Sequence, residues 1–587
     1  MKFLSNVLAV LVGLFLFTMI FFFGILLIGA IAGSGDETTH VSRNSVIELD
    51  LGQVTLDYGG KSFYKDFDYS EVNHDGVSDI IKAIDYAKTD DKIKGISILN
   101  PAAALGVAQT KALRDALEGF KKSGKFVLAY ADYYTQKDYY LASVADTVYI
   151  NPVGIFEFKG LSSEVMYYKD LQDKSGVNIE VVRHGKYKSA VEPFLDNKMS
   201  DANREQISTL LNSVWASLLK DISASRKISV DKLNDIATNV SARTPEMAKA
   251  QKLVDKIAYE DTYHDAIRKS LDVKKDKDYE TVKILDYAKN VATTATSGGA
   301  KDRIAIIYAQ GELIGGEGNE TYIGEGSMRR ALRDAREDKD VKAVVLRIDS
   351  PGGSALTAEL IWREIELTKK VKPVVVSMGN LAASGGYYIA CNANEIYAEE
   401  NTITGSIGVF GMLPNLTNLG NKIGLHTEKV ATHDNGADYS AFMPVDPKFR
   451  ALAQEQVETI YTTFVNRVAA GRRMTFEQVD NIGQGRIWSG TDALKIGLVD
   501  KIGGLDDAIK AAAEKAKIKK YSTRNYPEYE KDFDDLLASL GLPFTRSKAA
   551  LLKEELGAEN YAILEKLKKA TATQGVQALM PFELRIQ

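Results

Sequence analysis

“VKAVVLRI” (residues 341–348) and “PVVVSM” (373–378) are two continuous apolar runs on either side of “SALTAELIWREIELTKK” (354–370). The outer runs have the length and the β-branched content of buried strands, whereas the middle stretch carries apolar residues at helical spacing and ends in lysines. A strand, a helix and a second strand in this order indicate a βαβ unit, in which parallel strands are covered by helices. The sequence therefore predicts an α/β fold.

Two longer stretches have the pattern of amphipathic helices. They are “ANREQISTLLNSVWASLLKDISASRK” (202–227) and “PKFRALAQEQVETIYTTFVNRVAAGRR” (447–473). Their stripes of Leu, Val and Phe are typical of helices that bury one face. We expect both helices to pack outside the sheet, with the apolar stripes as ordinary core contacts.

The chain contains an internal duplication. The pentapeptide “LVDKI” occurs at Leu253–Ile257 and again at Leu498–Ile502. Other similar stretches keep the same order in the two halves, among them “KIKGISILNP” with “DVKAVVLRIDSP” and “DYYLASVADTVYINPVG” with “GYYIACNANEIYAEENTITG”. We therefore expect two tandem domains of one kind, at residues 44–289 and 303–520. The small and polar residues of 290–302 are typical of a linker.

Composition restricts the classes of function. A chain of 587 residues is long enough for several domains, and 45% hydrophobic with 26% charged residues is an ordinary globular balance. The net charge of -5, without a basic cluster, argues against a nucleic-acid partner. The one cysteine, Cys391, cannot form an intramolecular disulfide, and no Cys/His spacing of a metal site occurs. We expect neither a metal nor a cofactor.

The N-terminus is strongly apolar. No charged residue occurs from Phe3 to Gly33, which is longer than the roughly 20 residues that cross a bilayer. A cleaved signal peptide is the alternative, because Ala30-Ile31-Ala32 resembles a cleavage site, but a signal core has only about 7 to 15 apolar residues. We therefore expect residues 1–33 to be a retained transmembrane anchor, with residues 3–33 in the bilayer. Lys2 places the N-terminus in the cytoplasm.

The stretch “NLAASGGYYIA” (380–390) contains a candidate nucleophile. Ser384 lies between small residues, directly before the expected first turn of a helix. A serine at this position is a common helix N-cap, because its hydroxyl accepts a backbone N–H. The stretch alone leaves both roles open.

The stretch “RIDSPGGSALTAE” (347–359) predicts an oxyanion hole. Gly352 and Gly353 lie between a strand end and a helix start, so their backbone N–H groups can face a cleft. A phosphate-binding loop is the alternative, but the Lys and Ser/Thr that follow its glycine are absent. Both this stretch and Ser384 follow strand ends, at the edge where sites of open α/β sheets form.

A serine nucleophile needs a base. Of six histidines, only His426 and His433 follow Ser384, and neither lies in sequence that suggests a catalytic triad. A lysine with a pKa lowered by burial is the alternative. The stretch “RHGKYKSAVEPF” offers Lys186 and Lys188 among small and apolar residues. An isolated lysine is usually a solvated surface group, so these residues alone do not identify the base.

Five motifs carry a resemblance to a known family: “MGNLAASGGYYIA”, “DSPGG”, “ENTITGSIGVFG”, “GKYKSAVEPF” and “GRIWSGTDALKIGLVDKIGG”. In this arrangement, across two tandem halves behind an apolar N-terminus, the chain resembles the long form of the signal peptide peptidase A family over nearly its whole length. The resemblance implies a membrane-anchored serine protease with a Ser/Lys dyad, on tandem domains of the Clp protease and crotonase type.

The resemblance also assigns roles to residues. It implies that Ser384 is the nucleophile and Lys188 the general base. By the same resemblance, the amides of Gly353 and Gly385 form the oxyanion hole, and Ser406 helps to orient the lysine. The substrates implied are hydrophobic peptides, such as cleaved signal peptides, and the resemblance suggests a homo-tetramer. It further implies a single-pass protein of the bacterial inner membrane, with the bulk of the chain on the periplasmic side.

The duplication supports one site per chain. Pairing the halves sets Ser384 opposite Gln136 and Lys188 opposite Tyr439, while “SPGG” faces “NPAA”. The first half therefore lacks the serine and the glycines, and the second half lacks the lysine. Two other classes were weighed: a crotonase-like acyl-CoA enzyme, which would use the glycine hole without a serine, and a non-catalytic membrane scaffold. Both fit poorly with an intact “ASGG” and “YKSA”.

The C-terminal tail, residues 521–587, has helical spacing. We expect helices in “YEKDFDDLLASLG” (529–541) and “SKAALLKEELGAENYAILEKLKKA” (547–570), separated by “GLPF” and packed at the edge of the second half.

Overall fold

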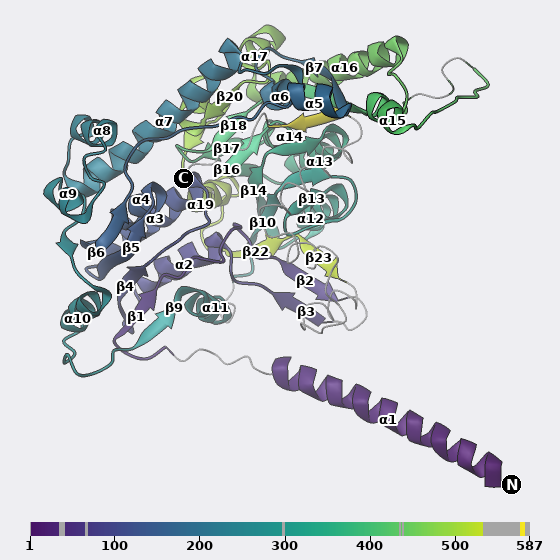
Figure 1. Cartoon of the computed structure of the whole chain (residues 1–587). Coiled ribbons are helices and arrows are strands. Elements are labelled where there is room, and N and C mark those ends of the chain that lie inside the picture. The colour runs from purple at the N-terminus through teal and green to yellow at the C-terminus, as the bar shows by residue number, and fades with distance from the viewer. Residues whose placement is uncertain are drawn as a thin grey trace.

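The structure is a computed structural model of one chain. It describes residues 2–33, 41–64, 69–295, 300–433, 436, 439–531 and 576–580. The first helix, α1 (Lys2–Gly33), stands apart from the other elements (Figure 1). Side chains of α1 are described at residues 6–7 and 9–24, and no helix among the described residues is both long enough and apolar enough to span a bilayer.

The first half contains a six-stranded parallel sheet in the order β8-β6-β5-β4-β1-β9. Its strands are β1 (Ser45–Glu48), β4 (Ile93–Leu99), β5 (Phe126–Tyr134), β6 (Thr147–Phe156), β8 (Lys256–Ile257) and β9 (Thr281–Lys283). Its helices are α2 (Val77–Ala87), α3 (Val107–Lys121), α4 (Gln136–Ala142), α5 (Lys169–Ser175), α6 (Glu192–Leu195), α7 (Asp201–Arg226), α8 (Val230–Thr238), α9 (Pro245–Ala250), α10 (Glu260–Ser270) and α11 (Ile284–Ala295). A 3-10 turn, η1 (Ser189–Val191), precedes α6.

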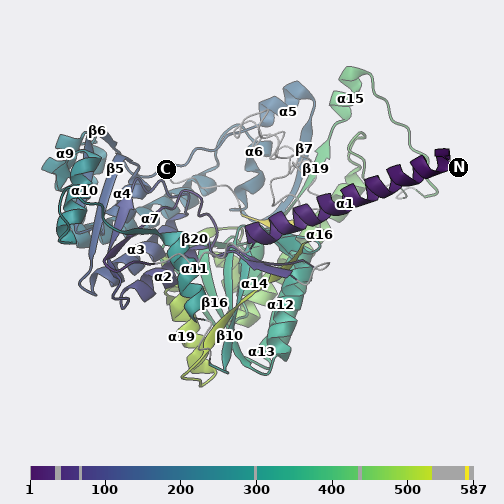
Figure 2. The same ribbon diagram turned by 90° about the horizontal axis from the view of Figure 1, so that it is seen from below.

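The second half contains an eight-stranded sheet, and Figure 2 shows the two sheets next to each other. Its strands are β10 (Arg303–Gln310), β14 (Val341–Ser350), β16 (Val374–Ala383), β17 (Glu395–Ala398), β18 (Ile403–Gly405), β20 (Ile487–Ser489), β21 (Lys501–Ile502) and β22 (Ser522–Tyr526). Its helices are α12 (Glu325–Glu337), α13 (Ala355–Lys369), α14 (Gly385–Ala390), α15 (Thr417–Ile423), α16 (Pro447–Arg472), α17 (Phe476–Ile482), α18 (Gly490–Lys495) and α19 (Leu505–Lys515).

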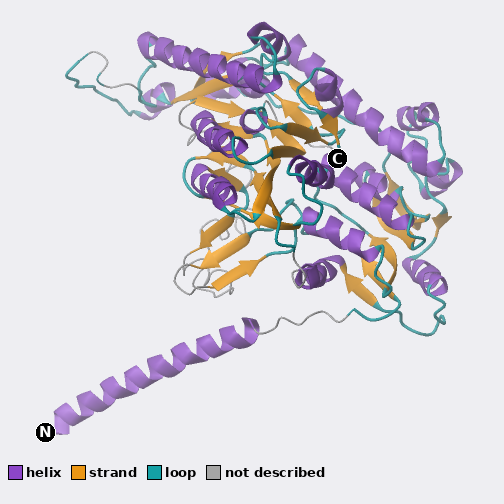
Figure 3. Ribbon diagram, turned by 180° about the vertical axis from the view of Figure 1, so that it is seen from behind, coloured by secondary structure: helices purple, strands orange, loops and turns teal. Residues whose placement is uncertain are grey.

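The predicted βαβ unit is confirmed. β14 and β16 are parallel neighbours, and α13 connects them. Both strands are buried along nearly their whole length, which explains their continuous apolar sequence. The two long amphipathic helices are also confirmed, as α7 and α16, and helices flank the strands of both sheets in Figure 3.

Equivalent side-chain contacts confirm the duplication. In the first half, the hydroxyl of Tyr139 donates to the carbonyl oxygen of Leu253 at 2.8 Å. In the second half, the hydroxyl of Tyr387 donates to the carbonyl oxygen of Leu498, also at 2.8 Å. In each half a tyrosine of the helix after the third strand thus holds the “LVDKI” segment in place.

A third sheet joins the two halves. Its order is β12-β13-β11-β15-β24-β19-β7. Its strands are β7 (Asn178–His184), β11 (Glu312–Ile314), β12 (Gly318–Asn319), β13 (Tyr322–Gly324), β15 (Gly352–Ser354), β19 (Val409–Asn415) and β24 (Val576–Leu579). β7 belongs to the first half and pairs antiparallel with β19 of the second, from His184 opposite Val409 to Asn178 opposite Asn415. This pairing fixes one half against the other at the carboxyl ends of their sheets.

The described part of the C-terminal tail corrects the expected helices. β22 adds to the second sheet beside β10, and β23 (Glu528–Lys531) forms a small sheet with β2 (Lys61–Tyr64) and β3 (Tyr69–Val72). Tyr529 is buried while Glu530 is exposed, which is the alternation of a strand. Pairing with strand edges far away in the sequence therefore makes this segment a strand and not a helix. The rest of the predicted helices at 529–541 and 547–570 lies outside the described residues.

The expected linker also begins later than predicted. α11 continues to Ala295, so residues 290–295 are helical. Ile284, Tyr287 and Ala288 of this helix are buried in the core of the first half. Because the apolar face of α11 packs against this core, the helix continues through residues 290–295, although their small and polar side chains are typical of an irregular linker.

A buried ion pair links the halves. The Nε of Arg347, on β14, lies 2.6 Å from Oδ2 of Asp57, which precedes α2, and both side chains are almost completely buried. Arg347 also donates to Ser377 and to the carbonyl oxygen of Met378. Removing one partner of such a pair leaves an uncompensated charge in the interior.

We predict that Asp57→Ala lowers the free energy of unfolding by about 3–5 kcal/mol, because Arg347 loses its nearest carboxylate. Urea denaturation followed by circular dichroism measures the loss. Asp235→Ala is the matched control, since Asp235 pairs with Lys232 on the exposed surface of α8, and this variant should unfold like the wild type. Equal midpoints for Asp57→Ala and the wild type would contradict the prediction.

Candidate active site

Ser384 lies at the end of β16, directly before α14, as the sequence predicted. Its φ of 55° and ψ of -114° place it in a conformation that non-glycine residues rarely adopt. Its side chain makes no capping hydrogen bond to α14, and the residue is fully buried. The N-cap alternative is therefore wrong. The hydroxyl oxygen of Ser384 instead lies 2.9 Å from the Nζ of Lys188.

Among the described residues, the amine of Lys188 has three hydrogen-bonding neighbours, all of them oxygen atoms. Besides Ser384, its Nζ lies 3.0 Å from the hydroxyl oxygen of Ser406 and 3.3 Å from the carbonyl oxygen of Ser406. Lys188 is fully buried, and burial lowers its pKa well below the ordinary lysine value. A neutral amine has two N–H groups and one lone pair. The two N–H groups can donate to Ser406, which leaves the lone pair for the hydroxyl proton of Ser384.

The pairing of β7 with β19 brings Lys188 to this position. β7 ends at His184, opposite Val409, so the chain after β7 runs past the residues that precede β19. Lys188 comes from the first half and Ser384 from the second, and the contact forms within one chain.

Two glycines make room for the lysine, and the sequence analysis missed their role. A Cβ on Gly485 would lie 2.7 Å from the Cβ of Lys188, and a Cβ on Gly408 would lie 3.1 Å from its Cδ. The first distance is shorter than real Cβ contacts and the second is tighter than most of them, so the lysine stem packs closely against both glycines. The signal was present in the sequence, because Gly408 belongs to “TGSIGVFG” and Gly485 begins “GRIWSG”.

Ser406 is held by the backbone on both sides. Its φ is 52°, and its N–H donates to the carbonyl oxygen of Arg486 at 2.7 Å. The preceding residue, Gly405, accepts the N–H of Ser384 at 2.8 Å. The two serines that contact Lys188 are therefore fixed to each other through neighbouring main-chain bonds.

The glycines of the predicted oxyanion hole lie next to Ser384. A Cβ on Gly385 would lie 3.2 Å from the Cα of Gly352 and 3.3 Å from the amide nitrogen of Gly353. The amide of Gly352 already donates to the hydroxyl oxygen of Ser350 at 3.2 Å. This leaves the amides of Gly353 and Gly385 as the candidate donors beside Ser384.

The corresponding place in the first half is closed. The amide of Ala103, which corresponds to Gly353, donates to the carboxylate of Asp138 at 3.2 Å. Gln136, which corresponds to Ser384, accepts the N–H of Gly160 and donates to the carbonyl oxygen of the same residue. These polar groups of the first half form hydrogen bonds within the protein and are not available to a substrate, so the described residues of the first half offer no second site of this kind.

The other candidate bases lie elsewhere. Lys186 is exposed and its Nζ lies over the ring of Tyr187. His426 and His433 are also exposed, in the segment after α15. Among the histidines that the structure describes, none has a hydrogen bond to Ser384. Within the same described residues, no group of three or more His, Cys, Asp or Glu could hold a metal ion.

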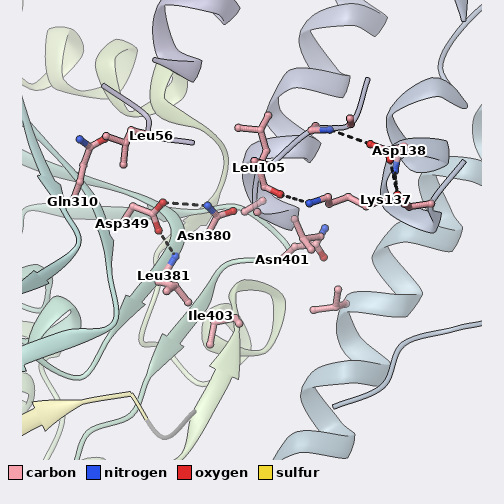
Figure 4. A pocket seen from close by; sticks show the side chains of 18 of the residues that line it. Leu56, Leu105, Lys137, Asp138, Gln310, Asp349, Asn380, Leu381, Asn401 and Ile403 are labelled. Carbon is pink, nitrogen blue, oxygen red and sulfur yellow. Dashed lines mark hydrogen bonds between the residues drawn. The ribbon is translucent and has the colours of Figure 1, made fainter. Parts of the chain in front are cut away.

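A cavity of about 1090 Å³ opens between the halves, next to the oxyanion segment (Figure 4). Its lining combines Leu105 and Lys137 of the first half with Leu381 and Ile403 of the second. Ser384 is not part of the lining, but Pro351 is, and it precedes the glycines of the hole. The cavity therefore borders the serine site from one side.

Comparisons with known proteins place this geometry in a family. The model of “Peptidase family S49” matches residues 119–274 and 366–519. “Protease 4” of Salmonella typhi is 37% identical over 547 residues, which is 90% of this chain and 86% of that protein. “Protease 4” of Haemophilus influenzae is 35% identical, covering 84% of this chain and 83% of that protein. “Serine protease SPPA, chloroplastic” of Arabidopsis thaliana is 33% identical, covering 84% and 72%.

These matches define the class of protein. The chain is a serine protease. It belongs to peptidase family S49 and carries the family's domain twice in tandem.

We predict that the buried lysine makes stability rise with pH. The pKa of Lys188 is lowered in the folded state, so between that value and about 10.4 the unfolded chain binds one more proton. The free energy of unfolding should therefore increase by up to about 1.4 kcal/mol per pH unit in this range, relative to Lys188→Met, which has no such proton. Urea denaturation at several pH values from 7 to 10 measures the difference.

Lys186→Met is the control for this measurement, because Lys186 is exposed. It should show the same pH dependence as the wild type. If the wild type and Lys188→Met had parallel profiles, Lys188 would be charged in the folded protein.

Proposed function

We propose that this serine protease is a membrane-anchored endopeptidase that hydrolyses hydrophobic peptides, such as cleaved signal peptides, with Ser384 as nucleophile and Lys188 as general base. The observation that carries the proposal is the 2.9 Å separation of the two side chains in a fully buried setting, where none of the described carboxylates forms an ion pair with the lysine. Burial lowers the pKa of Lys188 and favours its neutral form, which can accept a proton. One site then serves the two repeats proposed at 44–289 and 303–520.

The reaction begins when the hydroxyl of Ser384 gives its proton to the Nζ of Lys188 and the serine oxygen attacks a peptide carbonyl. The amides of Gly353 and Gly385 donate to the developing oxyanion, and one such donor is worth about 3–4 kcal/mol of transition-state stabilisation. The protonated lysine then gives its proton to the leaving amine. Water, deprotonated by Lys188, hydrolyses the acyl-enzyme.

Ser406 acts in this proposal as a positioning residue. Both of its oxygens face the amine of Lys188. They accept the two N–H groups of the neutral amine and so direct its lone pair at Ser384. After proton transfer they also accept from the ammonium group, which lies beside Ser384 as well.

The proposed membrane anchor is residues 3–33. Its support is the uncharged sequence and the exposure of large apolar side chains in α1, such as Phe15 and Ile20. A bacterial inner-membrane protein with its N-terminus in the cytoplasm and its bulk in the periplasm would meet hydrophobic peptides released at that membrane. The proposal includes assembly into a homo-oligomer, a tetramer by resemblance.

The two alternatives from the sequence, a crotonase-like acyl-CoA enzyme and a non-catalytic scaffold, do not fit the match to a peptidase family. A serine-directed covalent probe tests whether Ser384 is the nucleophile. Labelling of Ser384 supports the protease, whereas labelling that persists in Ser384→Ala contradicts it.

We predict that Ser384→Ala and Lys188→Ala each lower kcat for peptide hydrolysis by about 10⁴-fold or more. Lys188→Arg should be equally inactive, because guanidinium does not deprotonate in this range. Wild-type activity should rise with pH through one basic limb, set by the lowered pKa of Lys188. A fluorogenic peptide assay at several pH values measures kcat of the wild type and of each variant.

The controls are Lys186→Ala, His426→Ala and His433→Ala, which alter exposed side chains and should keep wild-type rates. Loss of activity in a histidine variant, together with survival of Lys188→Ala, would restore a Ser/His mechanism.

We predict for the anchor that the mature protein begins near Met1, sediments with membranes and resists extraction by salt. N-terminal sequencing and fractionation measure this, with a variant lacking residues 1–33 as the soluble control. A mature start at Gly33 would show that the segment is a cleaved signal.

A further inference from the structure

The cavity of Figure 4 lies beside the serine site and contains none of the residues assigned to catalysis. Its volume is about 1090 Å³, and its lining comes from both halves. The first half contributes residues 102–108, which correspond in the duplication to the stretch of the oxyanion glycines. The second half contributes Asp349, Leu381 and Ile403, among others. The cavity therefore has room for a part of a peptide that lies away from the cleaved bond.

The strands set the distance from the serine to this cavity. Leu381, on β16, precedes Ser384 by three residues, and Ile403 of β18 is its partner in the parallel pair. Strands rise by about 3.3 Å per residue, so the cavity begins about 10 Å from the nucleophile along the strand. A bound peptide in extended form has the same rise. A substrate whose carbonyl lies at Ser384 therefore reaches the cavity with a residue about three positions away.

Asn401 is a buried amide in the wall of this cavity. It lies between β17 and β18 and is only 3% exposed. Among the described residues, neither its side-chain oxygen nor its side-chain nitrogen has a hydrogen-bond partner. Buried polar groups in proteins are normally hydrogen-bonded, and Figure 4 shows Asn401 at the cavity. A side-chain amide accepts at its oxygen and donates from its nitrogen. A peptide, which also has donors and acceptors, can complete these hydrogen bonds.

The charged groups of the lining are mainly carboxylates. The amine of Lys137 donates to the carbonyl oxygen of Leu105 at 2.8 Å and forms no ion pair within the described residues. Of the carboxylates, Glu157 alone has an ion pair there, with Lys159 at 2.9 Å. The excess of negative charge favours a cationic ligand. The charged residues of the lining are Asp132, Asp138, Glu157, Asp349 and Lys137.

Asp349 is the carboxylate of the lining that lies nearest in sequence to the oxyanion glycines. Its two oxygens accept from the N–H of Leu381 at 2.8 Å and from the side-chain amide of Asn380 at 3.1 Å, but it has no ion pair with a described residue. Burial, and then the negative charge of Asp57, raise the pKa of Asp349 to about 7. The neighbouring cation, Arg347, is already paired with Asp57. A bound cation would favour the charged form of Asp349.

The cation that fits this lining has an apolar stem. Within the described residues, no group of three or more His, Cys, Asp or Glu could hold a metal ion, so these carboxylates do not form a metal site. Much of the remaining lining is apolar and includes Leu56, Leu105, Val214, Leu381 and Ile403. Lysine and arginine carry their charge at the end of an apolar stem, and such stems pack along apolar surfaces. A basic side chain therefore matches both parts of the lining.

We propose that the cavity binds a lysine or arginine of the peptide substrate, about three residues from the cleaved bond, and that Asp349 and Asn401 determine this selectivity. The proposal rests on the proposed function, because it names the peptides that the serine site receives. The carboxylate of Asp349 pairs with the basic group. The side-chain oxygen of Asn401 accepts an N–H of the basic residue, and its nitrogen donates to a main-chain carbonyl of the peptide.

Binding is tested apart from hydrolysis, with the full-length variant Ser384→Ala in detergent. Calorimetry measures its affinity for a hydrophobic peptide that contains one lysine, and for the same peptide with norleucine in place of the lysine. The lysine peptide should bind about tenfold more tightly, as expected for a hydrogen bond between charged groups. Addition of Asp349→Asn or Asn401→Leu should remove this difference. Addition of Asn421→Leu, on the exposed surface of α15, should keep it.

Circular dichroism establishes that each variant is folded. Asn401→Leu removes two unpartnered polar groups from the interior, so it should be at least as stable as the wild type. Equal affinity of Ser384→Ala for the two peptides would overturn the inference, and water alone would then fill the cavity. A tenfold difference that persists in both Asp349→Asn and Asn401→Leu would overturn it as well.

Hydrolysis by the wild type tests the position of the basic residue. The lysine is moved along the peptide one residue at a time, and mass spectrometry identifies the cleaved bond. The value of kcat/KM should be highest with the lysine about three residues from that bond, on one side only. Hydrolysis that is independent of the lysine overturns the inference alone. If the wild type hydrolyses none of the peptides although Ser384→Ala binds the lysine peptide selectively, the proposed function fails and the binding site stands.

Discussion

The site depends on one constraint: burial without a counter-charge favours the neutral form of an amine. Desolvation disfavours the ammonium form, and the nearest groups to Lys188 are three oxygens of two serines, none of which carries a charge. Water is excluded from the amine only if protein atoms surround it on every side. β7 delivers the lysine from the first half, and Gly408 and Gly485 of the second half close over its stem. Neither half encloses the lysine alone, so the protein needs both domains in one rigid arrangement.

Duplication followed by divergence explains how two similar domains came to hold a single site. The first half keeps the helix after its third strand and the tyrosine that anchors “LVDKI”. Its place for an oxyanion hole is closed, because the amide of Ala103 donates to the carboxylate of Asp138. Its remaining contribution is Lys188, supplied across the antiparallel pair of β7 and β19. The buried ion pair of Asp57 and Arg347 holds the domains together at the same edge. Chemistry and domain association therefore share one interface, and disturbing that interface affects both.

The sequence predicts correctly those strands and site residues whose local pattern agrees with their burial. β14 and β16 are apolar throughout because both of their faces are covered, and Ser384, Gly353 and Gly385 meet because they follow the ends of neighbouring parallel strands. Local pattern could not separate Lys186 from Lys188, since both have the same neighbours in sequence and only the register of β7 buries one of them. It also missed the strands of the C-terminal tail, whose partners β10, β2 and β15 are distant in sequence.

The groove between β15 and β19 follows from the same architecture. The facing edges of β15 and β19 offer main-chain donors and acceptors to an extended segment, and β24 occupies them in this structure. Such edges also pair readily with any extended segment within reach. β24 shows that a segment of this chain reaches them, with Ala578 opposite Gly353 and Gln577 opposite Phe410. Backbone pairing does not depend on the side chains, so the same edges can hold any extended segment of suitable size.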